Sequence, residues 1–128
     1  DYTSKKNSSV QAWLPNIGGQ ILIAVASGSN YVRFSDGTQI CWGATGRFPG
    51  FNPMTTAWMP VYFAQPFIDA GYMVAAEPIV DGGNTWVLHT FCIGRDKTYA
   101  NIGLANGARD ITVNAGTVYS VIAIGHWK

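Results

Sequence analysis

The chain has 128 residues and a mass of 13.8 kDa, and 48% of its residues are hydrophobic, which suits one domain with its own core and excludes intrinsic disorder as its main state. Charged residues make up only 12% and the net charge is +1, so the basic stretches typical of nucleic-acid-binding proteins are absent. A charged share about half of the usual roughly 25% also suggests that partner chains cover part of the surface.

The polar first residues, which lack a leading methionine, predict a connector over residues 1–19 that continues from a longer protein. One β-domain is expected over residues 20–128. The polar start lacks the apolar stretch of a secretory signal peptide. No apolar run approaches the roughly 20 residues of a membrane-spanning helix, so we expect no insertion into a membrane.

Strand patterns dominate the rest of the chain, and no window repeats apolar residues at helical spacing over three turns. The apolar run Ile21–Val25 predicts a strand that is buried on both faces. Next, Tyr31–Phe34 and Gln39–Trp42 flank an Asp36-Gly37 pair. This pattern predicts a β-hairpin, because glycine adopts the positive φ that the tight turn needs.

The remainder alternates short strands with turn residues. Residues 43–53 predict an irregular loop, because they contain two prolines and three glycines. Pro78 requires an edge strand or a bulge. Turn residues about every 8–12 positions predict an all-β fold, a small antiparallel β-sandwich. The further strands are expected at Val61–Phe63, Tyr72–Ala76, Thr85–Ile93, Tyr99–Leu104, Ile111–Val113 and Val118–Ile124.

Two cysteines and two tryptophans lie inside strand-like runs. Cys41 and Cys92 are predicted to be buried thiols, since free cysteine is among the most buried residue types, and one disulfide between them stays open as an alternative. We expect Trp42 and Trp86 to belong to the core.

Signals for catalysis and metal binding are weak. No Gly-x-Ser-x-Gly nucleophile motif occurs, and turns account for Asp36 and Asp81, so we expect no catalytic residue, no enzyme activity and no cofactor. A catalytic pair of carboxylates that meets only in the folded chain, or across two subunits, stays open. His89 and His126 could meet, or their copies could surround a symmetry axis, but ordinary hydrogen-bonded histidines are the favoured interpretation and no metal site is expected.

Saccharide binding needs an aromatic ring that stacks on the apolar face of a sugar, together with planar hydrogen-bonding groups. Two charged turns, Gly94–Lys97 and Arg109-Asp110, are expected at one end of the sandwich, where loops often carry function. Each of them can equally be an ordinary solvated turn. The candidate ligand-binding residues are Trp58, Arg95, Asp96, Tyr99, Arg109, Arg47 and Phe51.

The segments Tyr31–Gly43, Pro60–Phe67 and Tyr119–Trp127 together resemble the C-terminal, receptor-binding knob domain of phage and prophage tail fibres. The hairpin Tyr31–Gly43 resembles the family's hairpin that ends in Trp-Gly. Pro60–Phe67 resembles the family's following Pro-Val-x-Phe strand. The end Tyr119–Trp127 resembles its terminal Ala-Ile-Gly-aromatic motif, although the aromatic residue that usually opens that motif is displaced or replaced here.

This resemblance covers roughly residues 20–128 and implies a β-sandwich similar in fold to H-type lectins. It implies a homotrimer at the tip of a virion tail fibre, made in the cytoplasm of the host bacterium and joined to an upstream fibre shaft. The implied ligand is a bacterial surface glycan, such as lipopolysaccharide or capsule, which is bound without cleavage. The family gives no residues that can be carried over to the receptor-reading loops.

Three other functions stay open. The domain could be a trimerisation cap of the fibre without a ligand, or a module associated with a depolymerase. A free-living H-type lectin is a further alternative.

Overall fold

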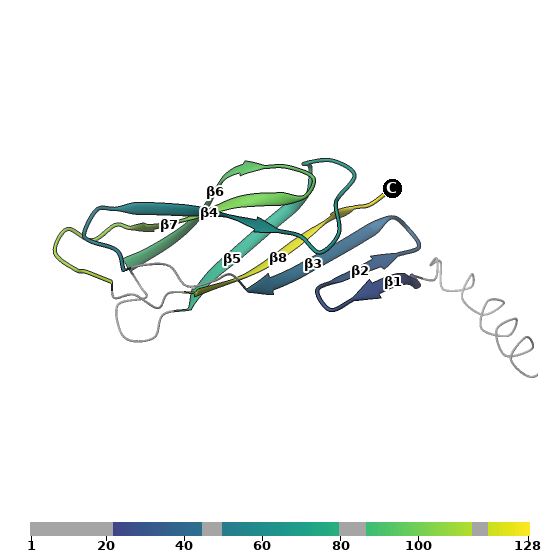
Figure 1. Ribbon diagram of the computed structural model, residues 1–128, viewed down its shortest axis with the longest axis horizontal. Coiled ribbons are helices and arrows are strands. Elements are labelled where there is room, and N and C mark those ends of the chain that lie inside the picture. The colour runs from purple at the N-terminus through teal and green to yellow at the C-terminus, as the bar shows by residue number, and fades with distance from the viewer. Residues whose placement is uncertain (1–21, 45–49, 80–86, 114–117) are drawn as a thin grey trace, which may run out of the picture.

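The computed structural model describes residues 22–44, 50–79, 87–113 and 118–128 (Figure 1). These residues form eight strands in two antiparallel sheets. A five-stranded sheet has the order β1-β2-β3-β8-β5, and a three-stranded sheet has the order β4-β7-β6. The predicted all-β class is therefore confirmed. Within these ranges, no helix is long and apolar enough to cross a membrane.

The strands are β1 (Ala24–Gly28), β2 (Tyr31–Phe34), β3 (Thr38–Ala44), β4 (Thr56–Tyr62), β5 (Met73–Ile79), β6 (Leu88–Arg95), β7 (Tyr99–Asn106) and β8 (Val118–His126). The connector predicted over residues 1–19 lies outside the described residues, as do Trp86 and Arg47.

The predicted hairpin is confirmed as β2 and β3. Gly37 has a φ of 98°, and its backbone N–H donates to the carbonyl of Phe34. The Asp36 carboxylate accepts hydrogen bonds from both the backbone N–H and the hydroxyl of Thr38, and these bonds lower the pKa of Asp36. The hairpin then pairs through β3 with the last strand, β8.

The prediction of a first strand buried on both faces is wrong. β1 begins at Ala24 and is an edge strand of the larger sheet, and Ile23 and Val25 are both more than half exposed. Figure 1 shows the reason, because β1 and β2 lie at the opposite end of the molecule from the three-stranded sheet. An apolar run alone does not indicate which strands a second layer covers.

Both strand prolines lie on edge strands, where a missing N–H costs no ladder bond. Pro78 belongs to β5, as expected, and Pro60 belongs to β4, which begins at Thr56 rather than Val61. Residues 111–113 are not a strand, since Val113 forms only an isolated bridge with Phe51.

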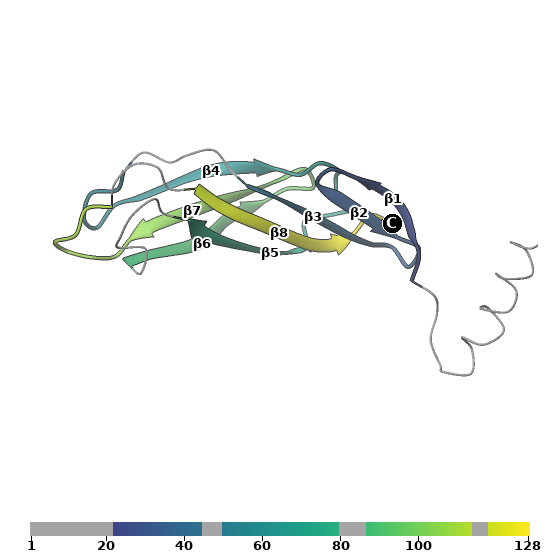
Figure 2. The same ribbon diagram turned by 90° about the horizontal axis from the view of Figure 1, so that it is seen from below.

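The core lies between the two sheets (Figure 2). Alternate residues of the larger sheet, such as Cys41, Val121 and Ala123, face alternate residues of the smaller sheet, such as Ile102 and Leu104, and all five are buried. The loop between β4 and β5 adds two buried aromatic residues. Phe67 and Tyr72 stack with ring centroids 4.6 Å apart, and Phe63 meets Tyr72 edge-on at 5.0 Å.

Two core predictions need correction. Trp42 is 42% exposed, because its neighbours Cys41 and Gly43 take the inward positions of β3 and strand side chains alternate. Cys41 is buried as predicted, and burial raises the pKa of its thiol. Cys92 is exposed, and neither cysteine forms a disulfide.

A buried polar side chain fixes the β4–β5 loop to the larger sheet. Gln39 is fully buried; its amide accepts a 2.7 Å hydrogen bond from Arg33 Nε and donates to the carbonyls of Gln65 and Pro66. Arg33 also lies over the ring of Trp127, with 5.2 Å from its guanidinium carbon to the ring centroid. The basic residue of the hairpin therefore has a structural role.

Candidate functional site

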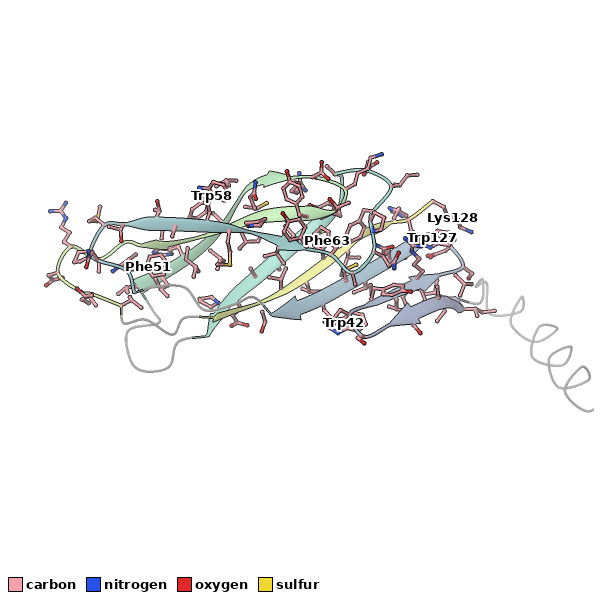
Figure 3. The ribbon with its side chains drawn as sticks, in the orientation of Figure 1. Trp42, Phe51, Trp58, Phe63, Trp127 and Lys128 are labelled. Carbon is pink, nitrogen blue, oxygen red and sulfur yellow. The ribbon has the colours of Figure 1, made fainter. Side chains whose placement is uncertain are left out.

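The outer surface of the three-stranded sheet carries a group of aromatic side chains. We call this surface the aromatic face and define it by Trp58, Tyr62, Phe91 and Tyr99. Along β4, burial alternates so that Trp58, Pro60 and Tyr62 point outwards. Figure 3 shows Trp58 on this outer side and Trp42 on the opposite side of the molecule. The predicted residues Trp58 and Tyr99 thus come together on one face.

Strand register arranges this face in rows. Trp58 is paired with Gly103, which in turn is paired with Phe91. A Cβ on Gly103 would lie 2.2 Å from Phe91 Cζ, so the Phe91 ring lies across the bare backbone of β7. Gly103 therefore allows an aromatic ring to cover the middle of the sheet.

A second aromatic pair lies at the end of β4. Tyr62 is paired with Tyr99, and their ring centroids are 5.6 Å apart at a tilt of 55°. Between the two aromatic rows lies Asn101, paired with Pro60 and with Gly94. Among the described residues, no hydrogen-bond partner is present for the Asn101 side-chain amide, which leaves a planar donor and acceptor between the rings.

These features suit an uncharged ligand with both apolar and hydroxylated surfaces. Trp58 is 56% exposed and Tyr62 72% exposed. They stand four residues apart on one strand, a separation of about 13 Å at roughly 3.3 Å per residue. Neither β4 nor β7 contains a charged residue. Two stacking rings with an amide between them can hold successive sugar units of a polysaccharide.

The predicted residues Arg95 and Asp96 have structural roles at this end of the sandwich. Arg95 donates from Nη1 to the carbonyl of Tyr72 at 2.6 Å and lies over the Tyr72 ring, 5.8 Å from its centroid. Asp96 accepts hydrogen bonds from the backbone N–H and hydroxyl of Thr98 and shapes the turn before β7. Both residues are exposed but their polar groups already have protein partners.

The side chain of Tyr72 is buried beneath this end of the sandwich. Its hydroxyl donates to the carbonyls of Tyr99, at 2.8 Å, and Asp96, at 3.0 Å. Burial is the main cause that raises the pKa of Tyr72 to about 12, since a buried phenolate would lose its hydration.

This pKa predicts a stability that falls in alkali. A folded-state pKa of about 12, above the ordinary value of 10.0, gives a stabilisation that is complete below pH 10 and lost as pH rises towards 12. Tyr72→Phe should destabilise the fold by about 1–2 kcal/mol at neutral pH and remove the latest phase of the tyrosine ultraviolet titration. A late phase that persists in this variant would contradict the assignment. Tyr62→Phe, at an exposed ring, is the control.

The remaining predicted residues lie elsewhere. Arg109 is exposed in the loop after β7, whereas Arg95 precedes β7, so the two charged turns lie at opposite ends of an eight-residue strand and not at one end as expected. Phe51 is only 3% exposed and pairs with Val113, so its prediction as a ligand-binding ring is wrong (Figure 3). Arg47 lies outside the described residues.

The two histidines also lie apart. His89 is near the start of β6, where it pairs with Ala105, and His126 is at the end of β8, where it pairs with Thr38. Within the described ranges, no group of three or more His, Cys, Asp or Glu side chains is close enough to hold a metal ion.

Two hollows border the edges of the sandwich. One has a volume of about 330 Å³ and is lined by Asn30, Trp42 and Tyr62 among others, so it adjoins the Tyr62 end of the aromatic face. The other, of about 550 Å³, lies beside Arg95 between β5 and β6, with Met73 and Cys92 in its lining. Volumes of this order fall within the range of small-ligand sites.

Three residues of the candidate site are missing from the sequence predictions: Tyr62, Phe91 and Asn101. The pattern of Thr56–Tyr62 contains a usable signal, because Trp58, Pro60 and Tyr62 alternate with the apolar Ala57, Met59 and Val61. The sequence prediction began this strand only after Pro60, at Val61. The positions of Phe91 and Asn101 depend on cross-strand register, which the sequence does not display.

No protein-family model and no curated protein matches the sequence. Two solved structures are similar. A C-terminal fragment of the P. aeruginosa R1 pyocin fibre has a TM-score of 0.60 and 17% identity, over 88% of this chain and 30% of the fragment. An N-truncated R1-type pyocin tail fibre has a TM-score of 0.60 and 18% identity, over 88% of this chain and 92% of that one. This chain thus spans under a third of the first fragment, and its two-sheet β-fold is one that tail-fibre C-terminal fragments share.

Proposed function

We propose that this chain is the receptor-binding domain at the tip of a phage or prophage tail fibre, and that it recognises a bacterial surface saccharide without cleaving it. The fold similarity to pyocin tail-fibre fragments supports the fibre role. The aromatic face carries the saccharide proposal, since Trp58 and Tyr62 expose rings on one uncharged surface. The domain acts as a homotrimer joined to an upstream shaft. The similarity to H-type lectins stays a prediction.

Weak binding at each site is part of this proposal. An open face leaves most of a sugar in water, so a single contact should have a dissociation constant on the order of mM. Several copies on a fibre, and several fibres on a particle, then raise the effective affinity through multivalency. Rapid release from any one site allows a particle to sample the cell surface.

The test is binding of the full chain to immobilised bacterial lipopolysaccharides and capsular polysaccharides. Trp58→Ala and Asn101→Ala should each weaken binding at least tenfold while the melting temperature changes little, because both side chains lie on the outer face of the sheet. Leu22→Ala is the matched control, since Leu22 is exposed to a similar degree on a distant edge. Equal binding by Trp58→Ala and the control would contradict the assignment of the site.

The same panel separates the alternatives. A trimerisation cap would bind no polysaccharide on the panel. A depolymerase module would release new reducing ends from a polysaccharide that it binds, whereas a receptor-binding domain would release none. We favour the receptor-binding domain, because a cap has no need of exposed aromatic rings on the face that is remote from the larger sheet.

A further inference from the structure

We propose that copies of this chain pack against one another through the outer surface of the five-stranded sheet. We call this surface the aliphatic face, and its residues are Val32, Ile40, Trp42, Met73, Ala75, Ile122 and Ile124. The inference rests on the proposed fibre assembly and names the surface and the partner that build it.

The aliphatic face is continuous because strand register aligns its residues. Ile124 is paired with Ile40 on one side and with Met73 on the other, and Ile40 is paired with Val32. This row crosses four strands. In the next row, Ile122 is paired with Trp42 and with Ala75. Side chains in such rows stand about 5 Å apart on the same face, so they form one apolar surface.

The large apolar side chains of the aliphatic face are unusually exposed to solvent. Met73 is 79% exposed, and Trp42, Ile122 and Ile124 are each more than 40% exposed. Each of the seven residues occupies about 4.8 Å across the strands and about 6.6 Å along its strand, so together they cover roughly 220 Å² in projection, and side-chain relief increases the accessible area. Apolar patches of a few hundred Å² are often functional, and a standard interface takes about 800 Å² from each partner. The face therefore supplies the apolar centre of such an interface.

The pattern of charge favours a copy of the same chain as the partner. Glu77 lies two residues beyond Ala75 at one end of the face, and His126 lies two residues beyond Ile124 at the other end. The residues between them offer no charge that would select a different partner. Three copies related by a threefold axis can turn their aliphatic faces towards that axis, so that the three faces share one apolar core. A hollow of about 230 Å³, lined by Ala75, Ile122 and Glu77 among others, gives room for a side chain from the neighbouring copy.

Light scattering on a sizing column tests this inference with the full chain. The wild type should have about three times its 13.8 kDa chain mass. Ile122→Glu should shift most of the protein to the monomer mass, whereas Trp58→Glu, a charge placed on the aromatic face, should leave the oligomer intact. A monomeric wild type would overturn the inference, and so would an Ile122→Glu variant that keeps the full oligomer mass.

A labelling experiment covers the case in which Ile122→Glu does not fold. In a Cys92→Ser background, where only the buried Cys41 remains, Met73→Cys and Trp58→Cys each add one thiol at an exposed residue, 79% and 56% exposed, on opposite outer faces. In the native protein, Cys at position 73 should react with a maleimide at least tenfold more slowly than Cys at position 58, and denaturant should equalise the rates. Equal native rates would show that no copy covers the aliphatic face.

The outcomes also distinguish this inference from the saccharide proposal. An oligomer with a protected position 73 that binds no polysaccharide would leave the interface in place and contradict saccharide recognition. A monomer that still binds polysaccharide through Trp58 would contradict the proposed interface and leave saccharide recognition in place.

Discussion

Replacing Gly125 with alanine should destabilise the fold by about 2 kcal/mol or more. Gly125 lies on β8, and a Cβ there would come within 2.6 Å of Tyr72 Cβ and 2.9 Å of Phe67 Cδ1. Tyr72 Cβ is next to the backbone and cannot rotate away, so the core would have to shift. Overpacking of a close-packed core costs about 1–3 kcal/mol. Chemical denaturation at one fixed protein concentration measures the effect, since association alters apparent stability.

Gly43→Ala is the matched control for this prediction. Gly43 lies on β3, pairs with Val121 of the same β8 strand, and has its nearest other heavy atom, Asn30 Nδ2, at 3.6 Å from the added Cβ. Its change in stability should stay within about 0.5 kcal/mol. If the two variants were equally stable, the close approach at Gly125 would not be the reason for glycine there. The glycine of the terminal Ala-Ile-Gly motif therefore has a packing explanation.

Replacing Asn106 with alanine should cost about 3–4 kcal/mol. Asn106 is buried, and its Nδ2 donates to the carbonyls of Ile111 at 2.7 Å and of Phe51 and Asn52 at 3.2 Å. Its Oδ1 accepts a hydrogen bond from the backbone N–H of Ala108 at 3.0 Å. Alanine would leave several buried polar groups without a partner, each at a cost of about 1–3 kcal/mol. Thermal and denaturant unfolding measure the loss.

Asn106→Asp separates lost hydrogen bonds from lost volume, because aspartate has nearly the same shape. Burial beside carbonyl oxygens raises the pKa of the new carboxyl above its unfolded value of about 3.9. The variant should therefore be most stable below about pH 4 and lose stability as pH rises towards 7, since the folded state then holds a proton that the unfolded state releases. Asn101→Ala, on the outer face of the same strand, is the control. A pH-independent loss would contradict the hydrogen-bonding role.

The local features of the fold were predictable from the sequence. The Asp36-Gly37 hairpin depends on a positive φ at a single glycine and on strand residues that adjoin it in the chain. Pro78 on an edge strand follows in the same way, since a residue without an N–H fits only where no ladder bond is needed. The bounds of the later strands were predicted to within a few residues, apart from β4, which begins at Thr56 rather than Val61, and the strand predicted at Ile111–Val113 is absent.

The faces of the strands were not predictable in the same way. Trp42 and Phe51 have similar apolar character, yet Trp42 is exposed and Phe51 is buried. The difference depends on which side of β3 the three-stranded sheet covers and on the bridge that Phe51 makes with Val113. Both are contacts between residues distant in the chain, so neither residue's own neighbours indicate the outcome.

In the candidate site, too, local features were predictable and contacts between distant residues were not. Strand periodicity, turn chemistry and composition are local properties, and they indicated a charge-poor all-β chain with exposed-ring candidates such as Trp58 and Tyr99. The packed fold was needed to show that Tyr62, Phe91 and Asn101 join them on one face, and that Arg95 and Arg109 lie at opposite ends of β7. Cross-strand register and the stacking of the two sheets determine the neighbours of each side chain. These pairings join segments that are distant in the chain, so the order of the residues does not indicate them.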